Sequence, residues 1–174
     1  MTKDYYRFCP RCATRLVWRQ EHAGDRKVQI CPKCDFAFYD NPVGATDSVI
    51  VKDKKILMVR RMRQPRRGAY DFPGGFMSGF ETAEQSAIRE VREEVGLTFH
   101  PKRLLGTYIN TQYHWKGRRI PGIIVAWLGT ATGRLKLNDE VGHPEWIPAS
   151  RRITMAFRYQ QEVLRMARKI IRTS

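Results

Sequence analysis

The chain has 174 residues, of which 42% are hydrophobic and 28% charged, and this is the composition of an ordinary globular protein. The first ten residues lack an apolar run, and no stretch approaches the roughly 20 apolar residues of a membrane-spanning helix, so we expect a cytoplasmic protein without a signal peptide or membrane span. The net charge of +15 is concentrated from Pro101 onward, where the sequence has fourteen basic and four acidic residues. Such a surface attracts polyanions, either a pyrophosphate substrate or RNA, although a generally basic surface is equally consistent with it.

The N-terminal region carries two C-x-x-C pairs, Cys9 with Cys12 and Cys31 with Cys34. Pairs separated by about 18 residues have the spacing of a zinc ribbon. Four thiolates form a closed tetrahedral zinc site, which leaves no open position for catalysis. Disulfides are the alternative in a secreted protein, but nothing in the sequence indicates secretion. We therefore predict a structural zinc ion.

Residues 1–40 form the predicted zinc ribbon, and residues 41–174 form the second domain. The ribbon contains few apolar residues, so the metal is expected to hold two short hairpins together. Ala13 and Asp35 follow the cysteine pairs at positions where glycine would turn most easily. The ribbon is either a structural or dimer-forming unit or a binding site for nucleic acid or a partner protein, and the sequence leaves both roles open.

The second domain begins with a predicted β-hairpin. The β-rich runs 48–51 and 56–60 flank Asp53-Lys54, which is a turn signal. A basic loop follows at residues 61–68. Beside a pyrophosphate site, the arginines of this region would neutralise substrate charge, and the alternative is a solvated loop. The candidate substrate-binding arginines are Arg60, Arg66 and Arg67.

A helix is predicted in the middle of the segment Gly75–Leu97. Thr82 and Gln85 have the spacing of a capping box, and Gly96 is placed to end the helix in a left-handed turn. One face of the helix is apolar, and three carboxylates lie within an arc of roughly 100° beside it. The carboxylates are those of Glu90, Glu93 and Glu94.

Three carboxylates at this spacing repel one another, so a positive partner is expected. Oxygen ligands of this kind suit a hard divalent cation such as Mg²⁺ or Mn²⁺. The alternative is a solvated acidic face with Arg89 and Arg92 as partners.

Further strands are predicted after this helix. The runs 104–112 and 120–128 flank a polar connection that contains Tyr113 and Trp115, with shorter strands near 134–137 and 145–147. A helix from about 153 to 171 closes the chain. Tyr113 and Trp115 are candidates to stack a substrate base, with packing in the hairpin as the alternative.

The segment Gly75–Leu97 matches the pattern G-x5-E-x7-R-E-U-x-E-E-x-G-U, where U is a bulky aliphatic residue, at every fixed position. This pattern is the Nudix box, and together with the cysteines it makes the chain resemble a Nudix hydrolase with an N-terminal zinc ribbon. The resemblance implies an α/β fold of the α+β Nudix type, with a mixed sheet between helices. NADH pyrophosphatases combine the same two elements, but their downstream S-Q-P-W-P-F-P-x-S signature is missing here. The chain is more similar to shorter members that act on ADP-ribose or FAD.

The resemblance implies hydrolysis of a nucleoside diphosphate linked to another group, such as ADP-ribose, FAD or an NADH-like molecule. Mg²⁺ or Mn²⁺ would be held by the three glutamates and the backbone carbonyl of Gly75, and Arg89 would orient the glutamates through Glu81. A general base often comes from a later loop, where Glu140 is the first candidate and Glu145 the second. Phe80 stands where family members usually have glycine, so the turn into the helix is expected to differ.

Two other functions remain open. The charge and the ribbon are consistent with an enzyme that removes an NAD-type cap or a pyrophosphate from RNA 5′ ends. The second is a non-catalytic module that senses a nucleotide. The oligomeric state is not readable from the sequence, although a homodimer is common in proteins of this kind.

Overall fold

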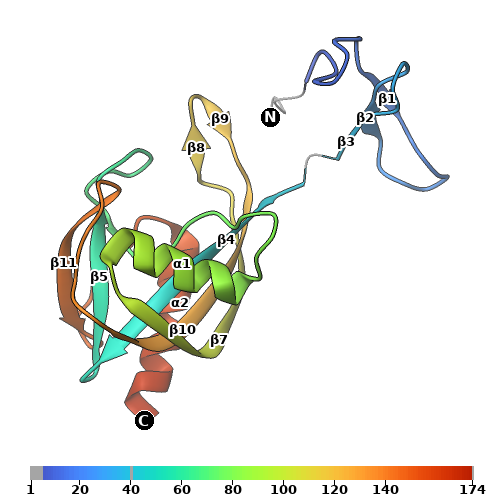
Figure 1. Ribbon diagram of the computed structural model, residues 1–174. Coiled ribbons are helices and arrows are strands. Elements are labelled where there is room, and N and C mark those ends of the chain that lie inside the picture. Colours follow the sequence, from blue (N-terminus) through green and yellow to red (C-terminus); the bar gives the residue numbers. More distant parts are fainter. Residues whose placement is uncertain (1–5, 40, 174) are drawn as a thin grey trace. The chain divides into compact units, whose positions relative to one another are not determined.

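The computed structural model describes residues 6–39 and 41–173, apart from the side chains of Trp115 and Arg118. The chain divides into two compact units, residues 1–42 and 43–174 (Figure 1). In the part of the chain that the structure describes, no helix is both long enough and apolar enough to cross a membrane.

The first unit is a three-stranded antiparallel sheet in the order β1-β2-β3, formed by Val17–Arg19, Val28–Ile30 and Ala37–Phe38. Its buried hydrophobic cluster consists of Cys9, Leu16 and Cys31, with Phe36 and the other two cysteines packed against it. A core this small cannot offset the entropy of ordering the chain without a further crosslink. We therefore expect the four cysteines to provide this crosslink by holding a metal ion.

Ala13 and Asp35 adopt the left-handed backbone conformation, with φ of 57° and 54°. Each closes a turn, since the Ala13 amide donates to the carbonyl of Cys9 at 2.9 Å and the Asp35 amide to that of Cys31 at 3.1 Å. Both cysteine pairs thus lie in equivalent turns. The expectation that these two positions favour glycine-like geometry is confirmed.

The second unit is a mixed sheet in the order β11-β5-β4-β10-β7, with the short β6 pairing with β5. Among the strand pairs of the described residues in this unit, β4 and β10 are parallel and the others are antiparallel. The predicted hairpin around Asp53-Lys54 is confirmed, and both turn residues have positive φ, of 49° and 56°. The strands are β4 Val43–Lys52, β5 Lys55–Arg61, β6 Tyr70–Asp71, β7 Thr98–Asn110, β10 Gly122–Thr132 and β11 Val141–Pro148.

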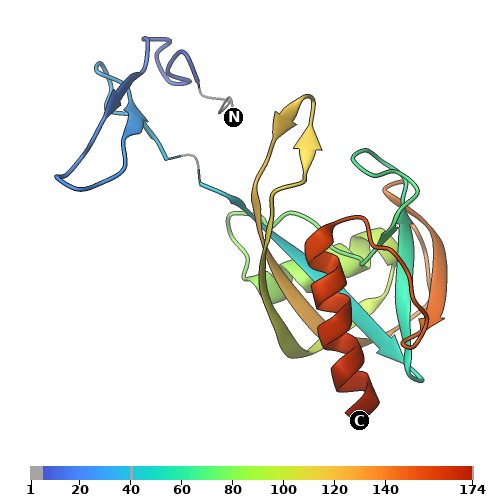
Figure 2. The ribbon, with the colours of Figure 1, turned by 180° about the vertical axis from the view of Figure 1, so that it is seen from behind.

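One helix covers each face of this sheet (Figures 1 and 2). Helix α1, Ala83–Val95, packs with Ile50 and Leu57, while helix α2, Arg158–Thr173, packs with Val49 and Ile56. Neighbouring residues of one strand thus enter opposite cores, because side chains alternate along a strand. The sheet between helices is the predicted α+β architecture.

Two predicted elements were wrong. Residues 134–137 form no strand, because the amides of Lys136 and Asn138 donate to the carbonyls of Val95 and Glu94 at the end of α1, at 2.9 and 3.0 Å. The last helix begins at Arg158 instead of near Ile153. The segment before this helix bonds to β6 instead of continuing the helix, since the amide of Ala156 donates to the carbonyl of Tyr70 at 2.8 Å.

The sheet opens between β4 and β5, which pair only next to their hairpin turn. The loop 72–77 enters this opening and bonds to β4: Thr46 donates to the carbonyl of Gly75 at 2.9 Å, and Ser48 to that of Pro73 at 2.8 Å. A Cβ at Gly74 would lie 2.1 Å from the Thr46 carbonyl oxygen, so only glycine fits there. The start of the Nudix box is thus fixed in the middle of the sheet.

A small hairpin extends from the sheet after β7 (Figures 1 and 2). It consists of β8, His114–Trp115, and β9, Arg118–Arg119. A hydrogen bond of 3.0 Å from the Ile120 amide to the Tyr113 carbonyl closes its base.

Candidate active site

Capping fixes the position of α1 relative to the loop before it. The Thr82 hydroxyl accepts from the Gln85 amide at 3.2 Å, and the Gln85 side chain accepts from the Thr82 amide at 2.8 Å. At the other end Gly96 is left-handed, with φ of 72°. The predicted capping box and glycine terminus are confirmed. With its ends held, the helix directs its carboxylates towards the loop 72–77.

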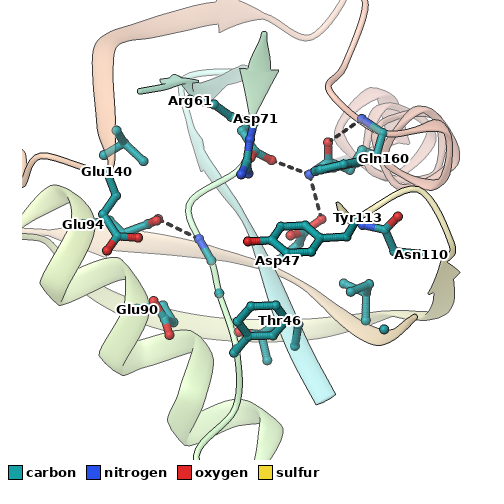
Figure 3. A pocket seen from close by; sticks show the side chains of 18 of the residues that line it. Thr46, Asp47, Arg61, Asp71, Glu90, Glu94, Asn110, Tyr113, Glu140 and Gln160 are labelled. Atoms are coloured by element: carbon teal, nitrogen blue, oxygen red, sulfur yellow. Dashed lines mark hydrogen bonds and ion pairs between the residues drawn. The ribbon is translucent and has the colours of Figure 1, made fainter. Parts of the chain in front are cut away.

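The carboxylates line a cavity of about 490 Å³ (Figure 3). Glu90, Glu93, Glu94 and Glu140 supply its acidic wall. The loop 72–77, the strands beside the sheet opening and the start of α2 supply the rest of the lining. The polar and aromatic residues among them are Asp47, Arg61, Arg63, Asp71, Asn110, Tyr113, Phe157, Tyr159 and Gln160.

Glu94 is the most buried of the box carboxylates, with 6% of the residue exposed. Its Oε2 accepts a hydrogen bond of 2.8 Å from the Gly74 amide. Burial raises the pKa of Glu94 well above its usual range, and repulsion from Asp71, Glu90 and Glu140 raises it further, against the effect of the Gly74 amide. A nearby cation would relieve this cost.

Glu90 packs directly against the box loop. A Cβ at Gly75 would lie 2.7 Å from the Glu90 carboxyl carbon, so the glycine makes room for the carboxylate. Burial raises the pKa of Glu90, although the neighbouring Arg89 favours its charged form. The Gly75 carbonyl accepts from Thr46 and keeps a second lone pair for another ligand.

Arg89 ties the helix to the loop in front of it. Its guanidinium bonds both carboxylate oxygens of Glu81, at 2.9 and 2.6 Å, and the Phe76 carbonyl at 3.0 Å. The same group contacts Glu90 at 2.7 Å and Glu93 at 3.0 Å. The Arg89 hydrogen bond lowers the pKa of Glu81 to about 2. This geometry supports the expected positioning role through Glu81.

Divalent metal chemistry fits the acidic wall, since three carboxylates and a carbonyl supply only hard oxygen donors. In the structure one guanidinium nitrogen of Arg89 bonds both Glu90 and Glu93, and the Gly74 amide donates to Glu94. Among the described residues, the four cysteines are the one group of three or more candidate ligands whose donor atoms all lie within 4.8 Å of one another.

The cysteine cluster fits a structural zinc ion. The sulfur of Cys12 lies 3.4 Å from that of Cys31 and 3.5 Å from that of Cys34, and Cys9 lies 3.5 Å from Cys34. A tetrahedron with Zn–S bonds of about 2.3 Å has sulfurs about 3.8 Å apart. The sulfurs are too far apart for disulfides, whose S–S bond is about 2.05 Å.

The structure separates the two candidate bases. Glu140 lines the cavity and forms an ion pair of 2.7 Å with Arg63. Glu145 does not line it. The hydrogen bond from the Tyr70 hydroxyl, at 2.8 Å, and the ion pair with Arg151, at 2.5 Å, lower the pKa of Glu145. Of the two, Glu140 therefore lies on the acidic wall of the cavity.

The arginines that line the cavity are Arg61 and Arg63, and not Arg60, Arg66 or Arg67. Alternation along β5 explains part of this difference, since adjacent side chains leave a strand on opposite faces. Arg61 bonds Asp71 at 2.5 Å, whereas Arg60 stacks 3.4 Å from the ring centre of Tyr70. Arg60 and Arg67 line a second hollow, which Arg61 also borders. Of the two aromatic candidates, Tyr113 lines the cavity, and the Trp115 side chain lies outside the described residues.

A buried polar network that the sequence analysis missed forms the floor of the cavity (Figure 3). The Gln160 amide donates to Asp47 at 3.2 Å and also to Asp71, which binds Arg61. Burial raises the pKa of Asp47 to about 7, repulsion from Asp71 adds to the shift, and hydrogen bonds from Gln160 and Tyr159 oppose it. The available signal was a carboxylate within an apolar strand, which needs partners when buried.

Replacing Asp47 by asparagine should change how stability depends on pH. Because the pKa of Asp47 is raised in the folded state, its contribution is fully present below about pH 4 and is lost as the pH rises through about 7. Asparagine imitates the protonated acid, so the variant should gain about 2–3 kcal/mol on wild type between pH 5 and 8.5.

The measurement is urea unfolding of both proteins at the two pH values, without added Mg²⁺. The charged and titratable neighbours Arg61, Asp71 and Tyr159 are common to both proteins. Asp139→Asn is the matched control, since this carboxylate is exposed and its pKa is lowered by Arg63. A constant difference between Asp47→Asn and wild type across this range would contradict the prediction.

Comparison with known proteins agrees with the fold and the box. A family model of the NUDIX domain matches residues 42–165. The ADP-ribose pyrophosphatase of Methanocaldococcus jannaschii is 34% identical over 126 residues, which cover 72% of this chain and 73% of that protein. The NAD-capped RNA hydrolase NudC of Pseudomonas aeruginosa is 34% identical over 91 residues, which cover 52% of this chain and 31% of that protein.

A solved structure extends the similarity to both units. The crystal structure of a NUDIX hydrolase from Nitrosomonas europaea superimposes with a TM-score of 0.70 and 22% identity, covering 96% of this chain and 91% of that one. At this identity the likeness concerns the fold. The family match over most of the chain, together with the complete box, shows that the protein belongs to the Nudix hydrolase family.

Proposed function

We propose that the chain is a metal-dependent pyrophosphatase that hydrolyses a nucleoside diphosphate linked to another group, with ADP-ribose as the first candidate substrate. The observation that carries this proposal is the convergence of Glu90, Glu93 and Glu94 with the Gly74–Gly75 loop on one wall of a cavity. The similarity to an ADP-ribose pyrophosphatase over 72% of the chain supports the choice of substrate.

The residues divide the work as follows. Bound Mg²⁺ or Mn²⁺ supplies charge neutralisation and an acidified water. Glu90, Glu93, Glu94 and the Gly75 carbonyl would hold the cation, and Arg89 would position the glutamates. Arg61 and Arg63 are placed to bind phosphate oxygens, because they line the same cavity.

The reaction itself is an in-line displacement. Glu140 accepts the proton of the attacking water, whose oxygen bonds to phosphorus while the bridging P–O bond breaks. ADP-ribose and water thus give AMP and ribose 5-phosphate. FAD and NADH follow ADP-ribose as candidates.

A substrate screen tests the proposal. Purified protein is incubated with ADP-ribose, FAD, NADH and NAD-capped RNA in Mg²⁺ or Mn²⁺, and products are identified by mass. We expect AMP from ADP-ribose, dependent on added metal, with the highest kcat/KM of the series. Absence of metal-dependent hydrolysis of every conjugate would refute the enzyme assignment and favour a nucleotide-sensing module.

RNA 5′ ends are the second candidate substrate, because of the hairpin at the cavity. Tyr113 and Ile120, the two residues at its base, both line the cavity, and Lys116 and Arg119 are exposed on the hairpin. These cations are placed to contact the phosphate backbone of a chain whose 5′ end occupies the site. The similarity to the NAD-capped RNA hydrolase NudC of Pseudomonas aeruginosa also motivates this candidate.

The hairpin gives this candidate a specific test. Lys116→Ala combined with Arg119→Ala should lower kcat/KM for NAD-capped RNA and flatten its dependence on salt, while leaving ADP-ribose hydrolysis unchanged. Lys52→Ala with Lys55→Ala, an equal loss of charge at the β4–β5 turn, is the control. Equal effects of the two double variants on RNA would reject a role for the hairpin.

A further inference from the structure

The cavity continues well beyond the carboxylates. Figure 3 shows Tyr113 and Asn110 on the side away from Glu94 and Glu140. This end is lined by apolar and aromatic groups together with one buried amide: Ala45, Gly122, Ile124, Tyr113, Phe157 and Asn110. A charged diphosphate does not bind favourably to apolar surface, so a less polar part of the ligand is expected to occupy this end of the cavity.

Small side chains keep the sheet surface open at this end. Ala45 and Ile124 are paired neighbours on β4 and β10, and Gly122 lies two residues earlier on the same face as Ile124. A Cβ added at Gly122 would first meet the flexible end of Ile124, at 3.3 Å, and the Val43 carbonyl, at 3.5 Å. The space above Gly122 is therefore part of the cavity, and a larger residue there would fill it.

Aromatic side chains border the same space. The ring of Tyr113 meets Phe76 edge-on, with centroids 5.4 Å apart, and lies 6.3 Å from Phe157. All three residues line the cavity. Aromatic faces are favourable stacking partners for a flat ring, and stacking of a base on an aromatic side chain contributes about 1–3 kcal/mol.

Asn110 adds a hydrogen-bond donor with a fixed orientation. The residue is only 5% exposed, and its Oδ1 accepts from the Gln112 amide at 2.9 Å. This bond determines that Nδ2 is the free end of the amide, and none of the described residues accepts a hydrogen bond from it. Because Asn110 lines the cavity, this amide nitrogen is available to donate a hydrogen bond to an acceptor of a bound ligand.

We propose that this end of the cavity is a slot for the nucleobase of the substrate, in which Asn110 Nδ2 donates to a ring nitrogen or carbonyl oxygen of the base. The small surface of Ala45 and Gly122 admits the ring, and Tyr113 and Phe157 provide the aromatic border. The inference rests on the proposed function, which places the diphosphate at the carboxylates. It assigns Asn110 and Gly122 as residues that determine substrate specificity.

Product binding tests the slot separately from catalysis. AMP and ribose 5-phosphate share the phosphate and the ribose, and only AMP carries a base. Calorimetry in Mg²⁺ should give a Kd for AMP at least about tenfold lower than that for ribose 5-phosphate, which corresponds to one stacked, hydrogen-bonded base. Equal affinities, or no binding of AMP to the wild-type protein, would overturn the proposal whatever the hydrolysis assay shows.

Two variants locate the site. Asn110→Asp keeps the acceptor for Gln112 and removes the donor, and Gly122→Val fills the slot. Each should weaken AMP binding about tenfold or more and leave the Kd of ribose 5-phosphate within twofold of wild type. Asn110→Asp also controls for charge, since repulsion of the phosphate would weaken both ligands equally. Thermal unfolding verifies that each variant folds, and Asn110→Asp alone decides the matter if Gly122→Val does not fold. An unchanged AMP preference in the folded variants would refute the slot.

Discussion

Glu94→Gln is expected to lower kcat by about a thousandfold or more while leaving the fold intact. A metal-bound water and a neutralised phosphate lower the barrier by several kcal/mol, and each 1.36 kcal/mol is tenfold in rate. Glutamine keeps an oxygen to accept the hydrogen bond from the Gly74 amide, so the local structure should persist. Burial raises the pKa of Glu94, so the neutral replacement should make the metal-free protein as stable as wild type, or more stable, at neutral pH.

Steady-state kinetics with ADP-ribose and urea unfolding measure the two effects. Glu93→Gln should also be inactive, although its side chain is half exposed and its loss should change stability little. Glu84→Gln, at an exposed position of the first turn of the same helix, is the matched control and should retain activity. Full activity of Glu94→Gln with Mg²⁺ would remove the box from the mechanism.

Removing one zinc ligand should unfold the N-terminal unit and leave residues 43–174 folded. Cys31 is completely buried, and the hydrophobic cluster around it holds little besides the four cysteines. Zinc binding in small units of this kind is worth about 10–16 kcal/mol, and this binding free energy is also folding free energy. Cys31→Ser should therefore lose the stoichiometric zinc and the dispersed amide resonances of the first unit.

Zinc analysis and NMR spectra of the full chain provide the measurement. Lys33→Ser is the control, because it introduces the same residue, serine, at an exposed position between Cys31 and Cys34 without removing a cysteine. If Cys31→Ser kept one equivalent of zinc and an unchanged spectrum, the cysteines would not be the ligands that hold this unit. A chelator that strips zinc from wild type should reproduce the spectrum of the variant.

Local signals predicted much of this structure. The Asp53-Lys54 turn, the capping box at Thr82 and the helix end at Gly96 depend on neighbouring residues, so the sequence contains the whole interaction. The spacing of the box placed three carboxylates on one side of α1 for the same reason. Two cysteine pairs likewise carry their own turn geometry.

Interactions between distant segments escaped prediction. Gln160 joins Asp47 across 113 residues and Asp71 across 89, and no periodicity links these positions. The segment 134–137 alternates basic residues with leucine, but the amides of Lys136 and of the following Asn138 donate to carbonyls at the end of α1. In the basic run 60–67 the sequence did not indicate which arginine faces the cavity, because a shift of one residue in a strand reverses the face.

The insertion of the loop 72–77 beside β4 has a consequence for how this protein can diverge. The carbonyls of Pro73 and Gly75 accept hydrogen bonds from β4, so the loop that faces the carboxylates cannot be displaced without breaking its bonds to the sheet. The opposite end of the cavity adjoins the connection from Asn110 to Gly122, which includes the hairpin, and we expect such a connection to tolerate changes in length and sequence. We therefore expect the carboxylate end of the cavity to change little among related proteins, and the end near Asn110 to vary with the substrate.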